Sequence, residues 1–260
     1  MANPVTSADS AAVFYDGLAA EYDAMTGFPG RLANARRWAA EVVARLAPAS
    51  VMVDVATGTG LYAIAFAGLG FAVTGADIAA EMLVLARKNA DAAGVKVAWL
   101  QTDMQNLAGR LAKPAGLLVC LGNSLPHLTQ PAELAAALGE FCAALAPGGV
   151  VVVQVLNYDK ILRAGERMVS ADRQGDTEFV RFYDFLPESG LVRFNVLRLH
   201  WQGNATAHDW QSVTLRAYTK AELEQALVTA GFTGLAAYSG LSFKPFDPAT
   251  SDTLTLVARR

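Results

Sequence analysis

The chain has 260 residues and a mass of 27.5 kDa, enough to bury the core of one large α/β domain or of two small ones. Its 53% hydrophobic and 17% charged residues are typical of a compact globular protein and exclude a disordered one. The net charge of −3 gives no broad basic field, which argues against nucleic acid or an anionic membrane as partner and favours a small-molecule substrate.

The N-terminal segment and the cysteines bear on localisation. Residues 1–16 contain no Lys or Arg and no apolar run, so they do not resemble a secretory signal. Cys120 and Cys142 are too few for a disulfide framework, which favours a reducing compartment. The uncharged stretch between Asp54 and Asp77 contains five glycines, so a strand, helix and second strand explain it better than a membrane span. We therefore expect a cytoplasmic protein.

The first predicted elements are two helices rich in alanine, leucine and aromatic residues, at 10–24 and 30–47. From Val51 onward, short β-branched runs alternate with longer amphipathic ones, a pattern typical of a parallel sheet with helices on both faces. The predicted strands are 51–55, 71–76, 95–100, 115–121 and 148–155, and the helices between them are 60–69, 79–93 and 131–146.

The pattern changes after the fifth strand. Three alternating runs, separated by turn residues at 187–190 and 203–204, predict an antiparallel three-stranded insertion at 178–186, 191–202 and 207–216. A helix at 219–230 and strands at 233–239 and 252–258 follow. The prediction is one α/β domain over 1–260, with a Rossmann-like, seven-stranded, mostly parallel sheet. Its parts are N-terminal helices or a lid (1–48), a cofactor-binding core (49–156), the insertion (157–217) and a last helix with two strands (218–260).

The strand at 51–55 runs into a glycine turn at Gly58 and Gly60 and then into a helix. Backbone N–H groups at such a turn point toward a ligand at the carboxyl end of the strand. Gly58-x-Gly60-x-x-Ala63 also satisfies the fingerprint of nicotinamide-dependent enzymes. Asp77, at the end of the second strand, can accept ribose hydroxyls in either case. These residues predict a nucleoside site without identifying the nucleoside.

The ends of the next two strands separate the interpretations. They read Gln101-Thr102-Asp103-Met104 and Cys120-Leu121-Gly122-Asn123-Ser124. With Asp54 and the glycine turn, they resemble the ordered motifs of class I S-adenosylmethionine-dependent methyltransferases over nearly the whole chain. The resemblance implies S-adenosyl-L-methionine as cofactor and S-adenosyl-L-homocysteine as product.

The same resemblance assigns parts of the cofactor to residues. It sets Asp77 at the ribose, Asp103 at the adenine amino group and Met104 beside the adenine ring. Residues around the methionine part are Asp54, Ala56, Gly58 and Gly60, and further contacts are implied for Ile78, Leu121, Gly122, Asn123 and His127.

Three segments resemble a narrower group, the glycine and sarcosine N-methyltransferases: Leu121 to Leu128, Asn157 to Leu162 and Phe243 to Phe246. Upstream, Arg31 matches the arginine that those enzymes set against the cofactor carboxylate. Tyr15 and Tyr22 match entrance aromatics that cover the cofactor, although packing between helices explains each tyrosine equally well.

The narrower resemblance fails at Leu156. The arginine that holds the amino-acid carboxylate in those enzymes immediately precedes the Asn-Tyr-Asp segment, where this chain has Leu156. Since losing such a pair commonly costs several kcal/mol, we expect glycine to be a poor substrate. The alternative sources of the charge are arginines of the insertion, Arg181, Arg193, Arg198 and Arg216.

The resemblance implies in-line methyl transfer from a sulfonium to a small-molecule acceptor, with an amine or amino-acid nitrogen favoured. Alignment of the reactants can supply about 7–11 kcal/mol, and a base is needed only for a protonated acceptor. Asn123 is expected to orient the acceptor. His127 is either a base or, in the preferred interpretation, a partner of the cofactor or backbone. Candidate walls of the substrate pocket are Tyr158, Arg181, Tyr183, Tyr218 and Phe246.

Two other functions stay open. A nicotinamide-dependent oxidoreductase predicts a Tyr-x-x-x-Lys pair or another hydride-transfer residue, and no convincing one is present. A non-catalytic protein that senses S-adenosylmethionine predicts a blocked acceptor pocket. No three ligands have the spacing of a metal site, so we expect no metal requirement, and the sequence leaves the oligomeric state open.

Overall fold

The computed structural model describes residues 7–186, 189–203 and 205–260. Parts of the two turns predicted in the insertion, at 187–188 and 204, lie outside the described residues, as does the start of the N-terminal segment. None of the described helices is both long enough and apolar enough to cross a lipid bilayer.

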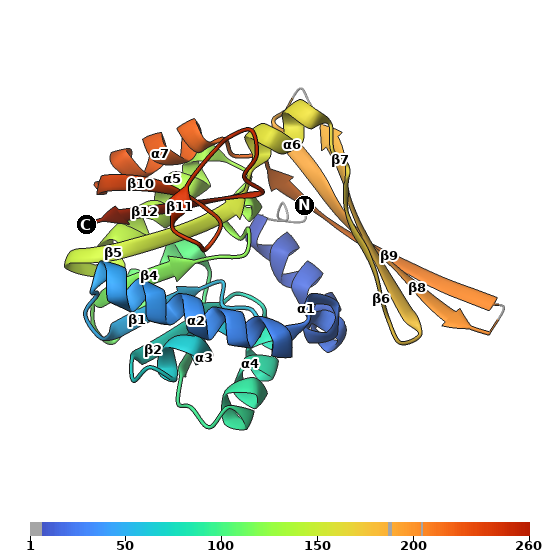
Figure 1. Ribbon diagram of the computed structural model, residues 1–260, viewed down its shortest axis with the longest axis horizontal. Helices are drawn as coiled ribbons and strands as arrows, with labels where there is room; N and C mark the ends of the chain where they lie inside the picture. Colours follow the sequence, from blue (N-terminus) through green and yellow to red (C-terminus); the bar gives the residue numbers. More distant parts are fainter. Residues whose placement is uncertain (1–6, 187–188, 204) are drawn as a thin grey trace, which may run out of the picture.

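An eight-stranded sheet forms the centre of the fold, in the order β11-β10-β12-β5-β4-β1-β2-β3 (Figure 1). Strands β1 to β5 are parallel to one another, while β12 runs antiparallel to both β5 and β10. Their bounds are β1 (Val51–Val55), β2 (Ala72–Asp77), β3 (Ala98–Gln101), β4 (Ala115–Cys120), β5 (Leu145–Leu156), β10 (Thr233–Ser239), β11 (Lys244–Pro245) and β12 (Thr253–Arg259).

The central strands are apolar on both sides because helices cover both faces of the sheet. All six residues of β4 are buried. One core cluster joins β4 and β5 to α5 (Pro131–Ala144) and α7 (Lys220–Thr229), and another joins them to α2 (Phe28–Leu46) and α3 (Leu61–Ala67). The remaining crossover helix is α4 (Ala80–Ala92).

A separate four-stranded antiparallel sheet, here called the insertion sheet, follows the fifth strand and the short helix α6 (Tyr158–Ala164). It stands apart from the central sheet, with α1 (Ser7–Thr26) between the two (Figure 1). Phe14 and Leu18 of α1 pack with Phe179 and Val196 on its inner face. Its strands are β6 (Met168–Gln174), β7 (Thr177–Leu186), β8 (Leu191–Gln202) and β9 (Ala205–Arg216).

The structure corrects both predicted strand counts. The insertion sheet has four strands rather than three, because β6 pairs with β7 along its length. Most residues of β6 are exposed and polar, so the strand depends on its neighbour and carries no apolar alternation. The central sheet has eight strands rather than seven, since the two-residue β11 pairs with β10. Helix α6 was not predicted either.

The buried centre of β4 offers a test of the core. Leu118 is 0% exposed, and Leu118→Ala is expected to lower the free energy of unfolding by about 2–5 kcal/mol through lost burial and the cavity left behind. Denaturant unfolding measures the change. The control is Leu162→Ala, which truncates a leucine that is 43% exposed and is expected to change stability by less than about 0.5 kcal/mol. Equal effects of the two substitutions would contradict this packing.

Candidate active site

Two adjoining cavities open at the carboxyl ends of the parallel strands. The first has a volume of about 1100 Å³, its mouth included, and lies among the loops after β1, β2, β3 and β4. The second, of about 860 Å³, lies between the ends of β4 and β5, helix α1 and the insertion sheet. Both are lined by Tyr15, Tyr22, Gly122 and His127. The strand order reverses between β1 and β4, where open α/β sheets bind ligands.

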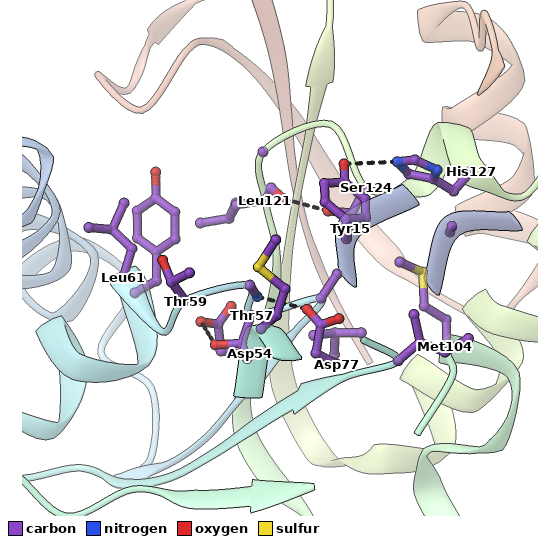
Figure 2. A pocket seen from close by; sticks show the side chains of 18 of the residues that line it. Tyr15, Asp54, Thr57, Thr59, Leu61, Asp77, Met104, Leu121, Ser124 and His127 are labelled. Carbon is purple, nitrogen blue, oxygen red and sulfur yellow. Dashed lines mark hydrogen bonds between the residues drawn. The ribbon is translucent and has the colours of Figure 1, made fainter. Parts of the chain in front are cut away.

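Asp54 stabilises the glycine turn beside the first cavity through two hydrogen bonds. Its Oδ2 accepts hydrogen bonds from Thr57 Oγ1 at 2.6 Å and from the backbone N–H of Ala63 at 3.0 Å. Burial raises the pKa of Asp54 to about 7, and these two hydrogen bonds oppose the shift. The side chain thus joins the end of β1 to the first turn of α3 and lines the first cavity (Figure 2).

The turn itself requires unusual backbone angles. Ala56, Gly58 and Gly60 have φ values of 54°, 55° and 89°. A Cβ on Gly58 would meet no atom within 4 Å, because the residue faces the first cavity. A Cβ on Gly60 would lie 2.8 Å from Trp99, and Gly60 does not line the cavity. Gly60 therefore packs closely against Trp99 of β3, and its predicted contact with a ligand stays a prediction.

Asp77 lies across the glycine turn at the end of β2. Its two oxygens accept hydrogen bonds from the backbone N–H groups of Gly58, at 2.7 Å, and Ala79, at 3.0 Å. The residue is only 7% exposed, and burial raises its pKa against the effect of these hydrogen bonds. Because each carboxylate oxygen has two lone pairs, Asp77 can still accept from two hydroxyls of a ligand. Ile78, the next residue, also lines the first cavity.

Asp103 and Met104, after β3, line the same cavity. Asp103 caps a single 3₁₀ turn at Met104–Asn106 by accepting from the backbone N–H of Gln105 at 2.8 Å. Both of its oxygens also accept from Asn106 Nδ2 at 2.9 Å. These contacts fix the carboxylate of Asp103 at the rim of the cavity.

The loop after β4 combines two left-handed residues, Gly122 with φ 72° and Asn123 with φ 70°. Asn123 Oδ1 accepts from the backbone N–H of Leu156 at 3.0 Å, and Nδ2 donates to Tyr158 Oη at 3.0 Å. Its amide therefore links the ends of β4 and β5. Asn123 lines the second cavity, and its predicted contact with the cofactor stays a prediction. Leu121 and Gly122 do line the first cavity.

His127 lies where the two cavities meet. Its Nε2 is hydrogen-bonded to Tyr15 Oη at 3.1 Å (Figure 2). Its Nδ1 is buried and has no partner among the described residues. Burial lowers the pKa of His127 to about 4, so the ring is neutral at physiological pH. In a neutral imidazole one nitrogen donates and the other accepts a hydrogen bond, so the tautomer decides which role is left to Nδ1.

Helices α1 and α2 cover both cavities. Tyr15 and Tyr22 lie two turns apart on one face of α1, with ring centroids 6.1 Å apart. Arg31 of α2 is the only cationic side chain among the described residues that line the first cavity. Its positive charge opposes the burial that raises the pKa of Tyr22 and of Tyr62.

Sequence reasoning missed a polar connection between α1 and the glycine turn. Asp23 accepts from Thr59 Oγ1 at 2.6 Å and from Asn89 Nδ2 at 2.8 Å. Asn89 also donates to the backbone carbonyl of Thr59 at 3.1 Å. The only signal in the sequence was an acidic residue directly after Tyr22. The missed residues that line the first cavity include Phe28, Thr59, Tyr62, Met82, Ser124 and Leu128.

The second cavity contains only part of the predicted substrate pocket. Arg181 and Tyr183 line it, whereas Tyr158, Tyr218 and Phe246 line neither cavity. Tyr158 is 1% exposed, and Tyr218 Oη donates to the backbone carbonyl of Leu128. Phe246 packs against the core cluster of α5 and α7. These three aromatic rings therefore have packing or hydrogen-bond partners in the protein, and their predicted place in the substrate pocket stays a prediction.

No group of three His, Cys, Asp or Glu side chains within the described ranges has the geometry to hold a metal ion. The thiol of Cys120 is fully buried. The charged side chains that line the two cavities are the three carboxylates, Arg31 and Arg181.

Comparisons with known proteins find methyltransferases as relatives. Residues 52–149 match the family described as "Methyltransferase domain". The chain is 30% identical over 195 residues to a dTDP-3-amino-3,6-dideoxy-alpha-D-glucopyranose N,N-dimethyltransferase of Streptomyces fradiae, covering 74% of each chain. The structure of DesVI from Streptomyces venezuelae matches with a TM-score of 0.68 and 26% identity, over 98% of this chain and 99% of that one.

A second type of relative acts on a different acceptor. The chain is 35% identical over 146 residues to a glycine/sarcosine N-methyltransferase of Halorhodospira halochloris, a match that covers 56% of this chain and 54% of the relative. The chain thus spans about half the length of the first curated relatives that it matches.

The burial of His127 predicts a pH effect on stability. Since burial lowers its pKa from 6.5 to about 4, the unfolded chain binds a proton between these pH values that the folded protein does not. The wild type is therefore expected to lose up to about 3 kcal/mol from this residue as the pH falls through that window. His127→Gln is expected to lack that loss. The measurement is denaturant unfolding above pH 6.5 and near pH 4.

The matched control is His208→Gln, which removes an exposed histidine of β9 and is expected to show the same pH dependence as the wild type. Unfolding free energies of wild type and His127→Gln that differ by a constant amount at all pH values would contradict the predicted burial effect.

Proposed function

The chain belongs to the S-adenosylmethionine-dependent methyltransferases, and we propose that it transfers a methyl group to the nitrogen of a small-molecule amine. The observation that carries the proposal is the pair of cavities that meet at Tyr15, Gly122 and His127. One cavity suits the cofactor and the other the acceptor. Relatives named as N-methyltransferases, for glycine and sarcosine and for amino sugars, support nitrogen as the accepting atom. The open second cavity argues against a protein that only binds the cofactor.

The residues of the first cavity fit S-adenosylmethionine. Asp77 is proposed to accept from the ribose hydroxyls, and Arg31 to bind the methionine carboxylate as a planar, charged donor. Asp103 is proposed to accept from the adenine amino group, with Met104 against the ring. Asp54 acts one step away, because its hydrogen bonds hold the glycine turn in shape. When bound, the cofactor supplies a methyl group activated by a sulfonium.

For methyl transfer, the second cavity must bind the acceptor as an unprotonated amine, because the nitrogen reacts through its lone pair. With S-adenosylmethionine held in the first cavity, the amine would receive the methyl group in exchange for a proton, which would pass to solvent, and S-adenosylhomocysteine would be the product. His127 is proposed to lie beside the amine as a neutral ring where the two cavities meet, held in place by its hydrogen bond with Tyr15. Asn123 contributes indirectly, by holding the ends of β4 and β5 together.

The cofactor assignment is tested by replacing the proposed ribose ligand. Asp77→Asn removes the charge but keeps the size, and a lost charge-assisted hydrogen bond is expected to weaken S-adenosylhomocysteine binding by about 10- to 100-fold. Calorimetric titration measures the dissociation constant. Asp91→Asn, an exposed position on α4, is the control and is expected to bind like the wild type. Binding of nicotinamide nucleotides instead of S-adenosylhomocysteine would refute the proposal.

The acceptor class is tested with a panel of amines, amino acids and hydroxylated compounds in a methyl-transfer assay. Nitrogen acceptors are expected to be methylated, and oxygen acceptors alone would contradict the proposal. Glycine is expected to be at least about 10-fold poorer in kcat/KM than larger amines, because Leu156 brings no charge into the second cavity. Leu156→Arg is expected to raise glycine turnover relative to Leu156→Met. Efficient glycine turnover by the wild type would show that another residue binds the carboxylate well.

A further inference from the structure

One charged side chain lines the second cavity. Among the described residues around it, only Arg181 carries a formal charge at neutral pH, since His127 is neutral there. Arg181 lies in the middle of β7, on the inner face that it shares with Phe179 and Tyr183. Those two neighbours are 2% and 3% exposed. Arg181 therefore carries a charge on a strand face whose neighbouring side chains are aromatic and buried.

The hydrogen bonds of Arg181 use only one edge of its guanidinium. Nε donates to Ser170 Oγ at 2.7 Å, and Nη2 donates to Asp172 Oδ2 at 2.8 Å, both from β6. Nη1 donates to no described residue. The side chain of Arg181 is 21% exposed, against 48% for Asp172. The two N–H groups of Nη1 therefore remain available to a molecule in the second cavity.

A purely structural role explains this arrangement poorly. Asp172 is half exposed, and an ion pair of that kind contributes little to stability. The charge of Arg181 instead affects the pKa of two tyrosines that line the second cavity. Burial raises the pKa of Tyr183 to about 12, and the charge of Arg181 opposes this shift. It likewise opposes the burial that raises the pKa of Tyr22. Both tyrosines line the second cavity.

The rest of the second cavity is largely apolar. Its lining includes aliphatic and aromatic side chains from α1, β5 and the insertion sheet: Leu18, Val155, Leu156, Val169, Phe194 and Leu215. Burying a hydrocarbon group of the acceptor against this wall is favourable, because it removes apolar surface from water. An acceptor as small as glycine offers no such group.

We propose that Arg181 binds an anionic group of the acceptor, and that the acceptor is an amine with both a carboxylate and an apolar body. The inference rests on the proposed N-methyl transfer. Arg181 is then a specificity-determining residue that recognises the carboxylate from the insertion sheet, while the apolar wall holds the body and His127 faces the nitrogen. A planar guanidinium with free N–H groups suits a carboxylate in charge and in shape.

The test compares acceptors that differ only in the carboxylate: leucine with 3-methylbutylamine, and phenylalanine with phenethylamine. The wild type is expected to favour the carboxylated member of each pair by about 10-fold or more in kcat/KM. Arg181→Gln is expected to abolish this preference, chiefly by raising KM for the carboxylated acceptor, and to change kcat/KM for the decarboxylated amine much less. The control is Arg193→Gln, which removes an exposed arginine of β8 that lines neither cavity.

The outcomes separate this inference from the function on which it rests. If the wild type methylates amines without regard to the carboxylate, or if Arg181→Gln slows both members of a pair equally, the assignment of Arg181 is wrong and N-methyl transfer stands. Weaker binding of S-adenosylhomocysteine to Arg181→Gln would also overturn it, by placing Arg181 at the cofactor. If the wild type methylates no amine at all, the proposed function itself fails.

Discussion

Two buried carboxylates determine the shape of the site. Asp54 and Asp77 are 1% and 7% exposed, and each accepts backbone N–H groups from the glycine turn or the helix that follows a strand. Burying a charge is costly unless hydrogen bonds compensate it, and the raised pKa of both groups reflects that cost. The hydrogen bonds in turn hold Ala56 and Gly58 in left-handed conformations that a free chain rarely adopts.

The same carboxylates give the first cavity its electrostatic character. Three acidic side chains line it, Asp54, Asp77 and Asp103, against a single cation, Arg31. A ligand that carries a positive centre beside a carboxylate, as S-adenosylmethionine does, matches this distribution. The acidic groups lie at the ends of β1, β2 and β3, whereas Arg31 comes from α2 on the covering side. The arrangement therefore favours one orientation of such a ligand.

The ends of the strands in the parallel core were predictable from sequence, because the residues of each strand and its buried position in the sheet both favour an extended conformation that ends at a turn. Strands β1 to β4 lie within three residues of their predicted positions, since a strand buried on both faces is a continuous apolar run ending at a turn. The predicted residues Asp54, Gly58, Asp77 and Asp103 do come together around one cavity.

Other features were not predictable because they depend on partners distant in the chain. Strand β6 exists through its pairing with β7, not through its own composition. Tyr158 appeared as a pocket aromatic, yet its hydroxyl accepts from Asn123, 35 residues away, and its ring is buried. The contacts of Gly60 with Trp99 and of Asn123 with Leu156 were not predictable for the same reason, because each partner lies on a strand distant in the sequence.

Helix α1 makes the two cavities parts of one site. Asp23 connects it to the glycine turn, and Arg198 of the insertion sheet bonds the carbonyl of Gly17 and the carboxylate of Glu21 on its other side. Tyr15 and Tyr22 then face both cavities from a helix anchored at both sheets. The core supplies most contacts in the first cavity, while α1, β5 and the insertion sheet supply most of those in the second. Changes in the insertion sheet can therefore alter the second cavity, the proposed acceptor site, while leaving the first cavity intact. This division suits a fold whose relatives are named for acceptors as different as glycine and an amino sugar.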